Sequence, residues 1–179
     1  MDKRKINYWY WFFKGYDDGP GYKKLVDKWL IAHFFLAIIL ALLSDISPSD
    51  AANAVLLPLA GIFIGLTFAW GGNVQALMQT EEIKELAENH PGGLPSYIFD
   101  YQTAILTILI TLVMWGMAGL ELFDFSDRFT LLKFPSEVFL YFLASMTLRE
   151  CWHVVLSAQY MLLYKKKIED LKKKNPPTK

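Results

Sequence analysis

Two long stretches of the chain contain no charged residue, and they limit the folds that it can adopt. Residues 51–80 contain no Asp, Glu, Lys or Arg, and neither do residues 101–120. A helix needs about 18–20 apolar residues to cross a bilayer, so both stretches are long enough for a membrane span. The sequence therefore predicts an integral membrane protein.

Two further stretches are weaker candidates for spans. Residues 29–43 are short for a crossing, although Lys28 can extend the stretch by reaching toward the membrane surface. Residues 138–164 are long enough, but they include Arg149 and Glu150, which need shielding inside a helix bundle. Counting both, we expect an all-α integral membrane protein with four transmembrane helices and short outer loops, the spans lying at 29–43, 51–78, 101–120 and 138–164.

The distribution of charge predicts the orientation of these spans. The chain has no net charge, yet seven Lys or Arg residues precede Trp29 and seven Lys residues follow Tyr164. The first connection, residues 44–50, has two Asp and no Lys or Arg. Cytoplasmic ends of spans are enriched in Lys and Arg, so both termini are expected in the cytoplasm.

The segments outside the spans have distinct compositions. Within the N-terminal segment 1–28, residues 6–13 are rich in Trp, Tyr and Phe, which favours a place at the cytoplasmic membrane surface. A cytoplasmic loop is expected at 79–100, ending in a turn at 90–95, and another turn is expected at 17–21. The basic C-terminal tail covers residues 165–179, and we expect it to begin as a helix and to end in a disordered segment.

Polar residues recur every four positions in the last predicted span. Ser145, Arg149, His153 and Ser157 would form one stripe on a helix. An ionisable residue inside a membrane costs roughly 3 kcal/mol on insertion scales, so the stripe is expected to face other protein. It could line a pathway for ions, or it could hold an assembly together.

Threonines repeat with the same spacing in the third predicted span, at Thr103, Thr107 and Thr111. A threonine hydroxyl can bond to a carbonyl of its own helix, which would make this stripe structural. Alternatively, it could face the stripe that contains Arg149 across the bundle. Gly61 and Gly65, four residues apart in the second span, form a spacing that lets another helix approach closely.

The sequence offers little support for catalysis or for metal binding. His33, His90 and His153 lie in separate segments, and Cys151 is the single cysteine, so neither a metal site nor a cofactor is expected. The pair formed by Arg149 and His153 is similar to the Arg-x(4–6)-His motif of HEPN ribonucleases, but only three residues separate it here. We expect no enzyme, with a membrane-embedded enzyme using Arg149 and His153 as the alternative.

The basic C-terminal end predicts contacts outside the membrane. Lysines beside a span attract anionic lipids, and they could also bind an acidic partner protein. Sequence-specific binding of nucleic acid is not expected. The lysines concerned are Lys165, Lys166, Lys167, Lys172, Lys173 and Lys174.

The layout of four short spans with cytoplasmic ends resembles small membrane subunits of bacterial anti-phage defence systems. Examples are the membrane subunit of the Kiwa system and the membrane accessory proteins of some RNA-targeting CRISPR loci. The resemblance implies a homo-oligomer in the cell inner membrane whose cytoplasmic face engages a soluble protein. Such a protein would act as a pore-like effector, or as a membrane anchor or sensor for that partner.

Overall fold

The computed structural model describes residues 7–15, 21–84, 93–123 and 130–174. The described residues form helices and contain no β-strand, which confirms the all-α class. The helices are α1 (Tyr8–Lys14), η2 (Gly21–Lys24), α2 (Lys28–Leu43), α3 (Pro48–Ala51), η3 (Ala52–Leu56), α4 (Leu57–Met78), α6 (Gly93–Gly119) and α7 (Thr130–Lys174).

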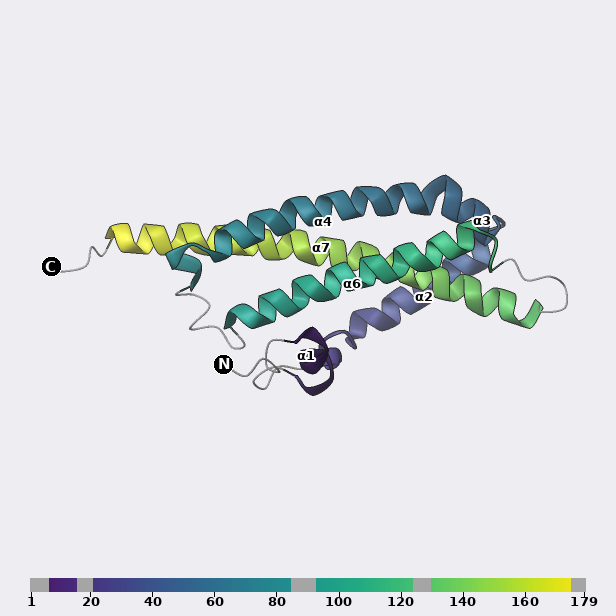
Figure 1. Ribbon diagram of the computed structural model, residues 1–179, viewed down its shortest axis with the longest axis horizontal. Helices are drawn as coiled ribbons and strands as arrows, with labels where there is room; N and C mark the ends of the chain where they lie inside the picture. Colours follow the sequence, from purple (N-terminus) through teal and green to yellow (C-terminus); the bar gives the residue numbers. More distant parts are fainter. Residues whose placement is uncertain (1–6, 16–20, 85–92, 124–129, 175–179) are drawn as a thin grey trace.

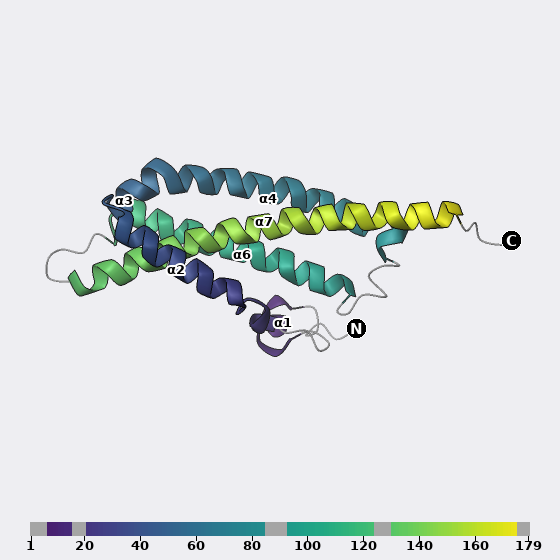
Figure 2. The ribbon, with the colours of Figure 1, turned by 180° about the vertical axis from the view of Figure 1, so that it is seen from behind.

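Four long helices lie side by side, and α7 contacts each of the others (Figure 1). Helices α2, α4 and α6 all pack against α7, and α4 also packs against α6. The view from behind shows α2 crossing α7 near the end where α2 joins α3 (Figure 2). Helix α7 is therefore the element around which the bundle is organised.

The second predicted span forms one continuous helical stretch, Pro48–Met78, with a bend near its start. The Ser47 side chain caps it by accepting a hydrogen bond from the backbone N–H of Asp50 at 3.1 Å. The next turn, η3, is π-helical and ends just before Pro58. Proline cannot donate a backbone hydrogen bond, and a π-helical turn is one of the local adjustments that accompany a kink. Figure 1 shows the change of direction between α3 and α4.

Most of the apolar surface of the bundle is exposed. Three helical stretches, Pro48–Met78, Ile98–Gly119 and Leu131–Lys174, are long and apolar enough to cross a membrane. Only 17–33% of the residues in their most apolar windows are buried inside the protein. Large apolar side chains so exposed need an apolar environment, which indicates a membrane protein.

The buried residues form small clusters at the two ends of the bundle. Trp115, Ala118 and Leu140 pack with Ala51 and Ala52, where α3 ends and η3 begins. At the opposite end, Val74 and Ile83 pack with Ala158 and Met161 of α7. Polar contacts occupy the region between these clusters.

Two helices extend beyond the limits expected from sequence. Helix α6 begins at Gly93, inside the predicted loop 79–100, because Gly93–Pro95 forms its first turn instead of a separate turn. Helix α7 begins at Thr130, before the predicted span at 138–164, and it continues through the basic residues as far as Lys174, as the expected helical end requires. The predicted turns fall partly on residues 17–20 and 90–92, which lie outside the described residues, as do 1–6 and 175–179.

Candidate functional site

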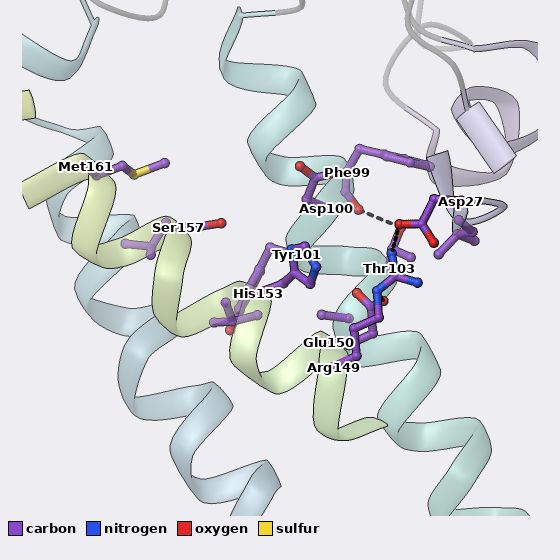
Figure 3. A pocket seen from close by; sticks show the side chains of 14 residues that line it. Asp27, Phe99, Asp100, Tyr101, Thr103, Arg149, Glu150, His153, Ser157 and Met161 are labelled. Carbon is purple, nitrogen blue, oxygen red and sulfur yellow. Dashed lines mark hydrogen bonds and ion pairs between the residues drawn. The ribbon is translucent and has the colours of Figure 1, made fainter. Parts of the chain in front are cut away.

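A cavity of about 210 Å³ lies where the start of α2 meets α4, α6 and α7. Figure 3 shows its labelled residues, which come from the segment before α2, from the first half of α6 and from the middle of α7. Its ionisable lining residues are Asp27, Asp100, Tyr101, Arg149, Glu150 and His153. Charged groups and apolar walls are thus combined in a single site.

Arg149 forms an ion pair with Asp27 in this site. Its Nη2 donates a hydrogen bond of 2.8 Å to Oδ2 of Asp27, and Figure 3 shows the side chain reaching across to it. Its Nε lies 3.8 Å from Oε1 of Glu150, which is too long for a hydrogen bond. The side chain is only 10% exposed, and neither Nε nor Nη1 has a hydrogen-bond partner.

Asp27 has two structural roles, and neither could be predicted from the spacing of polar residues along the sequence. It is the N-cap of α2, because its Oδ1 accepts a hydrogen bond from the backbone N–H of Leu30 at 3.1 Å. Its other oxygen accepts from Arg149. One carboxylate therefore fixes the start of α2 and ties it to α7.

The remaining members of the predicted α7 stripe separate into two groups. Ser145 is buried, and its Oγ lies 2.6 Å from Nδ1 of His33 on α2. His153 and Ser157 line the cavity together with Arg149. Ser145 and the Arg149 side chain are buried, whereas Ser157 is half-buried and His153 is exposed, and the members of the stripe do not meet one common partner.

The predicted threonine stripe of α6 is mainly satisfied within its own helix. Thr103, Thr107 and Thr111 each donate to the carbonyl four residues earlier, at 2.8–2.9 Å. Thr103 also lines the cavity. Thr111 accepts a hydrogen bond of 2.7 Å from Thr147 of α7. Thr147 was not predicted, because it lies on the other side of α7 from the spaced stripe and no pattern signals it.

The glycines that pack tightly differ from those that the spacing indicated. Nothing lies within 4 Å of a Cβ built on Gly61 or Gly65. A Cβ on Gly71 would instead fall inside the ring of Tyr101, which lines the cavity. Within one chain, α4 approaches α6 closely at Gly71, and the surface at Gly61 and Gly65 is open.

Helix α1 is attached beside the cavity by its first aromatic ring. Tyr8 stacks on Phe99 with ring centroids 5.4 Å apart, and its hydroxyl lies 3.2 Å from Oγ1 of Thr103. Burial raises the pKa of the Tyr8 phenol, so this group stays protonated at neutral pH. Trp9 and Phe13 of the same helix are exposed, as the predicted membrane-surface segment requires.

Cys151 and the histidines form no metal site in the part of the chain that the structure describes. No group of three or more His, Cys, Asp or Glu residues there could hold a metal ion. Cys151 is buried against α4, with its Sγ 3.5 Å from Oγ1 of Thr67.

Comparison with protein families, curated proteins and solved structures finds no match for this chain. The function must therefore be argued from the residues themselves.

Proposed function

We propose that this chain is a four-span membrane protein with both termini in the cytoplasm, which anchors a soluble partner or senses its state. The observation that best supports this proposal is that the end of α7 projects past the other helices of the bundle (Figure 1). The positions of α2, the surface of α7 and the pairing of the polar residues each support a part of this proposal.

Helix α2 is the fourth span in this arrangement. Its 16 residues give a length of about 24 Å, somewhat less than the roughly 30 Å of a hydrocarbon core. It packs along α7, and it exposes large apolar side chains such as Phe35, Leu42 and Leu43. The lysines before Trp29 and after Tyr164 then belong to the same side of the membrane, as the positive-inside rule predicts.

Cysteine labelling tests this topology. In a Cys151→Ala background, we expect Asp45→Cys to react with a membrane-impermeant maleimide in spheroplasts. Lys166→Cys should react only after the membrane is permeabilised, because it lies beyond the cytoplasmic end of the last span. Labelling of Lys166→Cys in sealed spheroplasts contradicts the proposed orientation.

The end of α7 has the pattern of a helix that docks another helix. Met161 is the last residue of α7 in the described core clusters. Beyond it, Tyr164, Ile168 and Leu171 follow the alternating three- and four-residue spacing of a coiled-coil seam. Tyr164 and Leu171 are about half exposed. This seam is apolar, already helical and outside the bundle.

The charges beside the seam indicate the kind of partner. On a helical wheel, Lys165 and Lys172 flank one side of the seam, and Lys167 and Lys174 flank the other. A second copy of α7 would bring lysines opposite lysines, which repel one another. A partner helix with an apolar seam flanked by Glu or Asp has the complementary charge, and we propose that the soluble partner supplies one.

A designed peptide tests the docking surface directly. We expect the protein in nanodiscs to bind a helical peptide that carries leucine at the seam and glutamate beside it. Lys165→Glu with Lys172→Glu should weaken binding about tenfold, because exposed ion pairs contribute roughly 0.2–1 kcal/mol each. Fluorescence anisotropy at several salt concentrations measures this effect.

Lys166→Glu with Lys173→Glu is the matched control, because these lysines lie on the opposite side of the same helix. Equal losses in the two double variants would mean that the peptide senses only net charge, and the docking surface would be disproved.

The pore-like alternative has less support from the polar residues. Ser145 is paired with His33, and Thr111 is paired with Thr147, so these hydroxyls are engaged between helices. A conducting lining would present them to water. Assembly into a homo-oligomer stays a prediction, for which the open surface at Gly61 and Gly65 is available. A role in anti-phage defence in the cell inner membrane, and the membrane-embedded enzyme as an alternative, also stay predictions.

A further inference from the structure

The cavity beside Arg149 has hydrogen-bonding capacity that the protein itself does not use. The guanidinium carries five N–H donors, and its Nε and Nη1 are buried without a partner. Buried donors normally find an acceptor in protein, water or ligand. A ligand of this cavity would therefore present an anionic or strongly accepting oxygen to Arg149.

The carboxylates around the cavity exclude a simple anion. Asp27, Asp100 and Glu150 line it together with the basic residues Arg149 and His153, and Glu150 is only 7% exposed. An anion that met Arg149 would also meet these negative charges at short range. The same ligand must therefore carry a positive group toward the carboxylates.

The apolar walls of the cavity and its place in the bundle limit the kinds of ligand that could bind there. Leu25, Val74, Phe99, Val154 and Met161 provide apolar lining. The outer faces of α4 and α7 expose apolar residues that suit acyl chains, such as Phe68 and Trp152. A volume of about 210 Å³ admits a small polar group and leaves any long chains outside.

We propose that this cavity binds a zwitterion with a primary ammonium and a phosphate, as in the headgroup of phosphatidylethanolamine. The phosphate oxygens accept from Nε and Nη1 of Arg149, for which a guanidinium is well shaped. The ammonium lies among the carboxylates of Glu150 and Asp100. The inference rests on the membrane placement proposed above, and it goes beyond the docking function of α7.

Lipid retention by the purified protein tests this inference. The wild-type protein is delipidated, mixed with equal amounts of phosphatidylethanolamine, phosphatidylcholine and phosphatidylglycerol, and examined by native mass spectrometry. We expect phosphatidylethanolamine to be retained at least about tenfold better than either of the others. Equal retention of phosphatidylcholine, which has no N–H donor, or preference for phosphatidylglycerol, which has no cation, excludes phosphatidylethanolamine as the ligand.

Two variants of the same helix separate the cavity from the general surface. Glu150→Gln keeps the shape of the side chain and removes its charge, so the preference for phosphatidylethanolamine should disappear. Glu169→Gln makes the same change on the exposed end of α7 and should retain the preference. If Glu150→Gln retains it as well, the cavity is not the site.

An experiment with a soluble compound distinguishes binding of a lipid headgroup from binding of a free zwitterion. O-phosphoethanolamine is added to the protein in phosphatidylcholine nanodiscs, and its effect on thermal unfolding is measured. Stabilisation without selective lipid retention assigns the site to a free zwitterion, and selective retention assigns it to the lipid. If neither occurs, the proposal is wrong. The peptide docking at α7 is measured on the same variants, so the failure of one proposal remains distinct from that of the other.

Discussion

Replacing Arg149 by alanine is expected to destabilise the protein by about 3 kcal/mol. Removal of one partner from a buried ion pair typically costs about 3–5 kcal/mol, because the remaining charge is left uncompensated. The lower end applies here, since the Asp27 side chain is 36% exposed and water can partly compensate it. Reversible unfolding in mixed detergent micelles measures this loss. Native mass spectrometry of the same samples reports the state of assembly.

The contribution of the ion pair is separated by a double-mutant cycle with Asp27→Asn. If the ion pair at 2.8 Å accounts for the loss of stability, the losses of unfolding free energy in the two single variants should sum to clearly more than the loss in the double variant. Lys166→Ala serves as the control on the exposed side of α7. A loss below about 0.5 kcal/mol in Arg149→Ala is typical of surface substitutions and would contradict a structural role. A lost oligomer with unchanged unfolding would instead assign Arg149 to contacts between subunits.

Gly71→Leu is expected to cost about 2–3 kcal/mol. A Cβ at Gly71 overlaps the hydroxyl and ring of Tyr101, so either that ring or the spacing of α4 and α6 must change. Overpacking of this kind usually costs about 1–3 kcal/mol. Unfolding in the same micelles measures it. A Tyr101→Ala background, which removes the clashing ring, should reduce the cost of Gly71→Leu.

The adjacent glycine provides the control for this change. Nothing lies within 4 Å of a Cβ built on Gly72, so Gly72→Leu should change the unfolding free energy by less than about 0.5 kcal/mol. If Gly72→Leu costs as much as Gly71→Leu, the effect does not come from the contact with Tyr101.

The helices of the bundle could be predicted from sequence because length and missing charge are local properties. The predicted span 29–43 differs from α2 by one residue, and the absence of charge from 51–80 marks the continuous helix Pro48–Met78. The start of α7 could not be predicted in this way, because the helix begins at Thr130, eight residues before the apolar run at 138–164. A helix can begin before an apolar run and continue after it, because each added residue, apolar or polar, forms one further backbone hydrogen bond.

The partners within the site could not be predicted in the same way. Arg149 and Asp27 are 122 positions apart, and only the packing of α2 on α7 brings them together. The four-residue spacing placed Arg149, His153 and Ser157 in one stripe, and these three residues line the cavity, whereas Ser145 of the same stripe contacts His33. It could not indicate which glycine meets a neighbour, because small residues allow close approach without specifying the helix that approaches.

The unbroken length of α7 has a mechanical consequence. From Met161, the last residue of α7 in the described core clusters, to Lys174 the helix continues for 13 residues, or about 20 Å. A tilt of about 10° at Met161, which also lines the cavity, would move the lysine-bearing tip by about 3 Å, given that helix length. A small rearrangement around the cavity is thus magnified at the surface that a soluble protein would meet.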